Sequence, residues 1–337
     1  MKFQILHVTR YVYPSPVRAS YNEVRIMPAT DDRQICHSFE LATTPAAKVL
    51  SYESVNGRVH HFDVRAAHTE LKVEGLSQVI TQPGTAEWLA RARAPLTFYQ
   101  DPTVQQRYAE YLQPTPQVPL RSEVDDFAAT ARQRLSNDDG APAGGAGPWE
   151  RDVAPAGAFL LALTRTLQSE LSYTRGATTV DTSLEQVLEH RSGVCQDFAH
   201  VMLAACRRQQ IPARYVSGYL FTGDTEAIRA SDETISPSAS ASFAASPAVT
   251  DEEAPRESLG GWSGGPANGD AMHAWVECLL PCGQWQGFDP TNGVVVDESY
   301  VKAQAGLDYG EVSPFKGVYD GPLDHWLEVS VRVTRQS

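Results

Sequence analysis

The spacing of apolar residues changes once along this chain of 337 residues, and the change limits which folds are open to it. From Phe3 to about Ile80, apolar and polar residues alternate in short segments, as they do in half-buried β-strands. The clearest pair of segments, Lys48–Val55 and Arg58–Val64, flanks Asn56-Gly57. Because Asn-Gly suits the two central positions of a type I′ turn, we expect a hairpin centred there. We therefore predict that residues 1–84 form a β domain of the sandwich or barrel kind.

From Thr85 onward the apolar residues follow a helical period, and Glu123–Leu135 is one such amphipathic stretch. We expect residues 85–155 to form a helical connector that includes a Gly- and Ala-rich linker at 136–147. Residues 156–337 are then expected to form a second domain of helices and strands. The predicted fold class is α+β.

Within the second domain, the sequence predicts a helix at Cys195–Gln209, a strand at Arg214–Phe221, and a hairpin made of Met272–Leu280 and Gln284–Asp289. Residues 222–269 are rich in Ser, Ala, Pro and acidic residues and have almost no aromatic residues. Such a composition cannot supply a core, so we expect a disordered loop there.

The charge balance limits the partners of the chain. Lys and Arg number 28 and Asp and Glu number 41, which gives a formal net charge of −13. An acidic surface repels phosphate backbones and anionic lipids, so we expect no nucleic-acid and no membrane partner. The N-terminal alternation reads as a strand and not as a signal peptide, and five cysteines are few for this length, so the predicted compartment is the cytoplasm. The sequence indicates no oligomeric state.

Cys195 follows Gly193-Val194 and is expected to open a helix. The partial positive charge at a helix N-terminus favours the thiolate, which is the nucleophilic form of cysteine, and first-turn amides could hold an oxyanion. The alternative is that Cys195 is a small buried apolar residue. A nucleophile would need a base, and His200, five residues along the same helix, is rotated by roughly 140° and points elsewhere.

His273 is the better base, because it lies on a predicted strand and Asp289 lies near its mirror position across a hairpin centred at Pro281. In that register the two side chains are cross-strand neighbours, and the carboxylate orients the imidazole. His273 could instead be a half-buried strand residue, and Asp289 could cap the Asp-Pro-Thr-Asn-Gly turn. No metal site is expected, since Cys278 and Cys282 lack a second Cys or His pair, and no cofactor motif occurs.

Four segments carry a resemblance to the bacterial transglutaminase-like superfamily. They are Arg191-Ser-Gly-Val-Cys-Gln-Asp-Phe-Ala-His200, Ile211-Pro-Ala-Arg-Tyr-Val-Ser-Gly-Tyr219, Asp270-Ala-Met-His-Ala-Trp-Val-Glu277 and Gly287-Phe-Asp-Pro-Thr-Asn-Gly293. The N-terminal residues His7–Val17 and Tyr21–Arg25 resemble the β domain that precedes this core in many bacterial members.

The resemblance implies a sandwich-like β domain followed by a papain-like core, in which Cys195 at a helix N-terminus and His273 and Asp289 on adjacent antiparallel strands form a catalytic triad. Tyr173 is a possible counterpart of the aromatic residue that helps bind the oxyanion in animal members. Met272 and Leu307 depart from the family, which usually has Ser and Arg there. Calcium dependence, known in animal members, has no support in this sequence.

Three functions stay open at this point. The first is thioester-forming acyl transfer from a protein or peptide amide to an amine acceptor. The second is a cysteine peptidase or amidase, in which water is the acceptor. The third is a catalytically idle scaffold that uses the β domain and the acidic loop to hold a partner.

Overall fold

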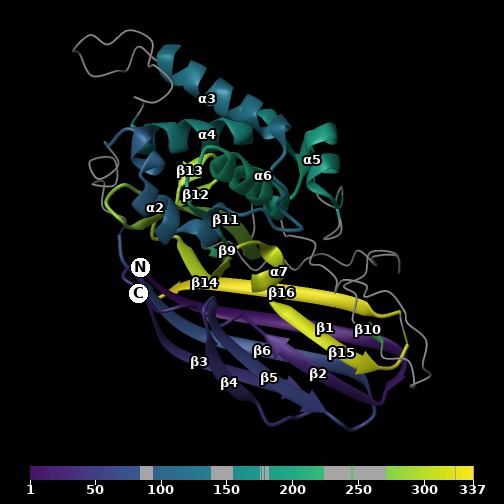
Figure 1. Ribbon diagram of the computed structural model, residues 1–337. Coiled ribbons are helices and arrows are strands. Elements are labelled where there is room, and N and C mark those ends of the chain that lie inside the picture. Colours follow the sequence, from purple (N-terminus) through teal and green to yellow (C-terminus); the bar gives the residue numbers. More distant parts are fainter. Residues whose placement is uncertain are drawn as a thin grey trace.

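The computed structural model has a helical layer on one side and extended sheets on the other, with a further sheet between them (Figure 1). It describes residues 1–83, 94–137, 155–174, 176, 178, 182–223, 244–245, 271–322 and 324–336. The predicted linker lies outside the described residues beyond Asn137, and so does the predicted loop apart from residues 222, 223, 244 and 245. None of the described helices is long and apolar enough to cross a membrane.

The first sheet has the order β16-β1-β6-β3, with β1 at Lys2–Val17, β3 at Gln34–Thr44, β6 at His68–Thr81 and β16 at Trp326–Gln336. The alternation of the sequence places every second residue of β1 in the interior from Phe3 to Tyr13. Near the start of β1, Phe3 and Ile5 pack against Tyr219 and Val301, whereas Tyr11 and Tyr13 pack within the β region.

The second sheet has the order β10-β15-β2-β5-β4, with β2 at Ala19–Val24, β4 at Leu50–Ser54, β5 at Gly57–Val64, β10 at Ala244–Ala245 and β15 at Phe315–Asp320. It shares one buried apolar cluster with the first sheet. The hairpin of β4 and β5 is confirmed, but the type I′ turn is wrong. Val55 and Asn56 form the loop between the paired residues Ser54 and Gly57, and of these only Gly57 has a positive φ, at 134°.

The third sheet has the order β13-β12-β11-β9-β14, with β9 at Ala213–Leu220, β11 at Ala271–Leu279, β12 at Trp285–Asp289, β13 at Val294–Val295 and β14 at Tyr300–Gly306. Helix α6 packs on β9 and β11. The remaining elements are η1 (Leu96–Gln100), α2 (Pro102–Arg107), η2 (Ala109–Leu112), η3 (Ser122–Val124), α3 (Asp125–Asn137), α4 (Ala156–Glu170), β7 (Ser172–Tyr173), α5 (Leu184–His190), β8 (Ser192–Gly193), α6 (Cys195–Arg208) and α7 (Tyr309–Val312). The expected mixture of helices and sheets is confirmed.

The last two strands return to the N-terminal sheets. β16 pairs with β1, and β15 pairs with β2, both antiparallel. The sequence-based expectation that all of residues 156–337 form the second domain is wrong for β15 and β16, because strand alternation does not say which sheet a strand joins. The N- and C-termini consequently lie side by side (Figure 1).

Candidate active site

Cys195 is the first residue of α6, as the sequence predicted, and its side chain is buried. The helix start is fixed by Asp197, whose Oδ2 accepts hydrogen bonds from the backbone N–H of Val194 at 2.8 Å and from Thr178 Oγ1 at 2.6 Å. Burial raises the pKa of Asp197, although these two donors oppose the rise. Gly193 is required here, because a Cβ at that position would lie 2.5 Å from Asp197 Oδ2. The Gly-Val-Cys segment therefore sets where the thiol points.

His273 on β11 and Asp289 at the end of β12 lie on neighbouring antiparallel strands. His273 Nε2 and Asp289 Oδ2 are 2.7 Å apart, and both side chains are buried. The predicted centre of the hairpin is wrong by one residue, however, which shifts the pairing by two residues. Val276 pairs with Phe288, so the hairpin is centred at Cys282 and not at Pro281, and His273 reaches Asp289 diagonally. The side chains meet because diagonal neighbours remain within reach of a ring as long as imidazole.

Cys195 also acts on the His273 ring, because it is one of the groups that raise the pKa of that imidazole. Since Nε2 faces Asp289, Nδ1 is the ring nitrogen left for the sulfur. Burial on its own lowers the pKa of His273, but the charge and hydrogen bond of Asp289, together with Cys195, raise it to about 10. At neutral pH the imidazole therefore carries a proton.

Asp289 both orients the histidine and caps the turn, so the two alternatives left open by the sequence hold together. Oδ1 accepts from the backbone N–H groups of Thr291 at 2.8 Å and Asn292 at 3.2 Å. Oδ2 accepts from His273, from Asn292 Nδ2 at 2.6 Å and from Tyr300 Oη at 2.7 Å. Burial would raise the pKa of Asp289, but His273 and the neighbouring donors lower it, so the carboxylate stays ionised.

Two aromatic residues beside this pair were missed by sequence reasoning. Tyr300 donates to Asp289, and Trp275 meets Tyr300 edge to face with ring centroids 5.4 Å apart. Trp275 lies against Gly218, where a Cβ would come within 2.4 Å of the indole. The only signal in the sequence for Tyr300 is its place at the start of an apolar-alternating strand.

The other predicted residues lie as follows. Tyr173 is half-buried on β7, where it pairs with Gly193 two residues before the thiol. His200 points away from the site, as expected, and accepts from the backbone N–H of Tyr309 at 3.3 Å. Met272 packs in an apolar cluster with Tyr219.

All five cysteines are free thiols. Cys206 and Cys278 are buried, with their sulfur atoms 3.7 Å apart. Among the described residues, no group of three or more His, Cys, Asp or Glu side chains could hold a metal ion.

The fold and site define a class of protein: a two-sheet β region joined to a mixed core in which a cysteine at a helix start faces a His–Asp pair. Residues 150–290 match the family model of the transglutaminase-like superfamily, and residues 3–80 match that of the bacterial transglutaminase-like N-terminal region. The chain belongs to the transglutaminase-like superfamily, and its N-terminal region is of the kind found in bacterial members.

The chain is similar to uncharacterised mycobacterial proteins along its whole length. It is 32% identical to one from Mycobacterium leprae over 335 residues, which cover 99% of each chain. It is 26% identical to one from Mycobacterium bovis over 339 residues, which cover 98% of this chain and 92% of that protein. A crystal structure from Cytophaga hutchinsonii, provisionally described as a cysteine protease, has 19% identity and a TM-score of 0.66, covering 100% of this chain and 92% of the other. At that identity the likeness concerns the fold alone.

Proposed function

We propose that the protein is a thiol acyl-transfer enzyme that acts on protein or peptide amides through a thioester at Cys195. The observation that carries the proposal is the buried His273, which lies 2.7 Å from Asp289 and interacts with Cys195 at the start of α6. Membership in the transglutaminase-like superfamily supports the same reading.

In this mechanism the Cys195 thiolate attacks the amide carbonyl carbon, and a carbon–sulfur bond forms. His273 gives its proton to the departing amine or ammonia as the carbon–nitrogen bond breaks, which leaves a thioester. His273 then takes a proton from the incoming acceptor, which attacks the thioester and releases the thiolate. Asp289 keeps the ring oriented and stabilises its protonated form. The buried surroundings strengthen each of these interactions.

The first-turn amides of α6 are suited to bind the oxyanion of the tetrahedral intermediate. Tyr173, beside Gly193, is the proposed additional donor. Its contribution is tested by Tyr173→Phe, which should lower turnover while leaving the rate of Cys195 alkylation unchanged, because alkylation forms no oxyanion.

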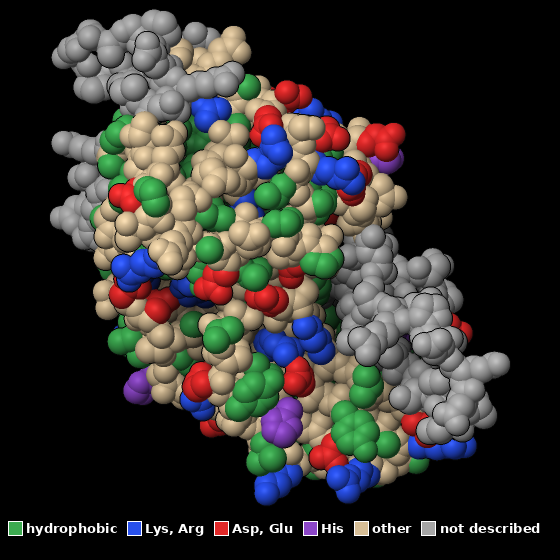
Figure 2. Space-filling model, in the orientation of Figure 1, with side chains coloured by type: hydrophobic (Ala, Val, Ile, Leu, Met, Phe, Trp, Pro, Cys, Tyr) green, Lys and Arg blue, Asp and Glu red, His purple; other side chains and the backbone are tan. Residues whose placement is uncertain are grey.

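The acceptor is proposed to be an amine, with water as the alternative that would make the protein a peptidase or amidase. A site that excludes water favours the amine, and the site residues Cys195, His273 and Asp289 are 1%, 8% and 0% exposed. Nothing in this chemistry uses a metal or cofactor. On the face shown in Figure 2, basic and acidic side chains are interspersed, which fits a protein or peptide substrate better than a polyanion. A cytoplasmic location stays part of the proposal.

The test is to incubate the protein with a peptide library and a labelled amine, and to follow ammonia release, peptide cleavage and amine incorporation together. Cys195→Ala should abolish all three, and mass spectrometry should find an acyl adduct on Cys195 in the wild type. Cys282→Ala is the matched control, because Cys282 is an exposed cysteine on the β11–β12 turn. Incorporation without cleavage supports the amine, and cleavage alone supports water. If Cys195→Ala gives the same ammonia release, cleavage and incorporation as the wild type, the proposal is wrong and the scaffold hypothesis is favoured.

A further inference from the structure

We infer, resting on the proposed function, that Tyr300 is a positioning residue for Asp289. The N-terminal β region keeps Tyr300 in place by bonding the backbone of Glu298 before it and of Lys302 after it. Two observations carry this inference. Tyr300 is hydrogen-bonded to the Asp289 carboxylate, and the short segment 298–302 around it is hydrogen-bonded at both ends by residues that are far away in the sequence.

The first step concerns Asp289 itself. Tyr300 Oη donates to the same oxygen, Oδ2, that faces His273 Nε2. The carboxylate has no contact with solvent, so its position is decided by its hydrogen-bond donors. Burial and the nearby Asp289 charge raise the pKa of Tyr300, so its hydroxyl stays protonated and remains a donor. The other acidic group that acts on Tyr300 is Asp297, three residues before it.

The second step concerns the C-terminal side of Tyr300. The side chain of Gln34 on β3 bonds the backbone of Lys302 in both directions: Lys302 N–H donates to Gln34 Oε1 at 2.7 Å, and Gln34 Nε2 donates to the Lys302 carbonyl at 2.8 Å. The same carbonyl accepts from the N–H of Ala29 at 2.9 Å. Gln34 is 3% exposed, so these bonds do not compete with water.

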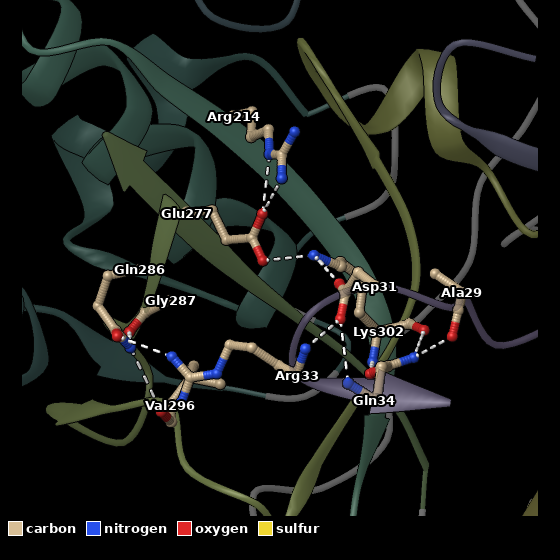
Figure 3. Close-up of polar contacts among 10 residues, drawn as sticks. All are labelled: Ala29, Asp31, Arg33, Gln34, Arg214, Glu277, Gln286, Gly287, Val296 and Lys302. Carbon is tan, nitrogen blue, oxygen red and sulfur yellow. Dashed lines mark hydrogen bonds and ion pairs between the residues drawn. The ribbon is translucent and has the colours of Figure 1, made fainter. Parts of the chain in front are cut away.

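The side chain of Lys302 adds a half-buried charge cluster at the same place (Figure 3). Its Nζ lies 2.7 Å from Asp31 Oδ2 and 2.8 Å from Glu277 Oε1, and Glu277 also pairs with Arg214 at 2.6 Å. Asp31 comes from the N-terminal β region, whereas Glu277 and Arg214 lie on β11 and β9. The cluster therefore ties the segment before β3 to the core sheet directly beside Tyr300.

The third step concerns the N-terminal side of Tyr300. Thr81 Oγ1, at the end of β6, donates to the carbonyl of Glu298 at 2.7 Å. Residues 298 and 302 thus flank Tyr300, and each is bonded by a residue of the first sheet. Because the site tolerates displacements of only a fraction of an ångström, a shift of this segment would move the hydroxyl off Asp289.

The test measures iodoacetamide alkylation of Cys195 across pH, together with acyl-substrate turnover, in the full chain. Tyr300→Phe removes a donor from the ionised form of Asp289, so the pKa of Asp289 should rise and the acid limb of both profiles should move to higher pH. Because the carboxylate also loses a contact that positions it against His273, alkylation at neutral pH should be about tenfold slower. Gln34→Met and Thr81→Val should move the acid limb in the same direction by a smaller amount.

Two matched controls are available. Tyr319→Phe removes a buried tyrosine hydroxyl that donates to the Pro322 carbonyl, and Gln78→Met changes an exposed glutamine on β6; neither should move the profile. A lower melting temperature with an unmoved acid limb in Tyr300→Phe would reduce Tyr300 to a packing residue and overturn the inference. If the acid limb moves in Tyr300→Phe but not in Gln34→Met or Thr81→Val, the β region does not hold Tyr300 in place and that part of the inference is wrong. If His273→Ala alkylates as fast as wild type, the proposed function itself fails.

Discussion

Asp289→Asn should cost both reactivity and stability, and the structure allows the size of each to be worked out. An asparagine has one oxygen and one NH₂ group where the carboxylate has two acceptors. If the NH₂ group takes the place of Oδ1, it faces the N–H groups of Thr291 and Asn292; if it takes the place of Oδ2, it faces His273, Asn292 Nδ2 and Tyr300. Either orientation sets donor against donor in a site without solvent.

A buried donor left unpaired costs about 1–3 kcal/mol, so we expect Asp289→Asn to destabilise the protein by about 2–3 kcal/mol. For a domain of 150–250 residues this is a fall of roughly 5–10 °C in melting temperature. The loss of the carboxylate also removes the main charge that holds a proton on His273, so Cys195 alkylation at neutral pH should slow by about a hundredfold or more.

The assay combines differential scanning fluorimetry with alkylation rates on the same preparation. Asp101→Asn is the matched control, because Asp101 also caps a backbone N–H, that of Thr103 at 2.7 Å, but does so in an exposed position. It should change the melting temperature little and the alkylation rate not at all. Normal reactivity with lowered stability in Asp289→Asn would show that the residue serves only the turn, and the reasoning about the triad would be refuted.

Four further predictions follow from the charges and burial of the described residues. Turnover should fall as pH rises through about 10, because His273 loses the proton that the leaving amine needs, while Cys195 alkylation should not fall; a turnover profile flat to pH 11 would contradict this. Because the folded pKa of His273 lies above the ordinary value, its contribution to stability is complete below about pH 6.5 and is lost as pH rises toward 10, which urea unfolding at several pH values measures. Glu277→Gln should cost about 3 kcal/mol, since it removes the buried carboxylate of Arg214 and leaves Lys302 with Asp31 alone, whereas Glu70→Gln in the half-exposed pair with Arg10 should cost less than about 1 kcal/mol; equal melting temperatures would refute the difference. At pH 6 iodoacetamide should label Cys195 ahead of exposed Cys282, and buried Cys206 and Cys278 should label only after unfolding, as peptide mapping will show.

Local patterns in the sequence are sufficient to predict the parts of the site that depend on residues adjacent in the chain. Gly193-Val194-Cys195 predicted the start of α6, and the apolar alternation around Pro281 predicted the β11–β12 hairpin. The predicted hairpin centre is off by one residue, and the pairing by two, because turn residues alone do not fix which of two adjacent centres a hairpin adopts. The catalytic roles of Cys195, His273 and Asp289 remain predictions that the experiments above address.

The contacts around Tyr300 could not be predicted, because they join residues that are far apart in the chain. Gln34 and Lys302 are separated by 268 positions, and Thr81 and Glu298 by 217. Neither pair follows a period or a motif, and a glutamine in an edge strand is ordinarily a solvated side chain. The Gln34 side chain bonds the nearby Ala29 carbonyl as well, but its two bonds to Lys302 form only because the start of β3 lies against β14.

The two ends of the chain are also far apart in the sequence but paired in the fold, and this pairing decides how the β region can be studied. β1 pairs with β6 on one side and with β16 on the other, so the last strand completes the sheet that the first strand begins. Phe3 and Ile5 on β1 pack against Tyr219 and Val301 of the core sheet, and Val333 on β16 joins the same cluster. Cutting the chain after the core would therefore strip β1 of a partner and open this cluster to water. Because truncation at either end disturbs the core sheet as well as the β region, the contribution of the β region to the site has to be measured by point substitutions such as Gln34→Met, which leave the strands in place.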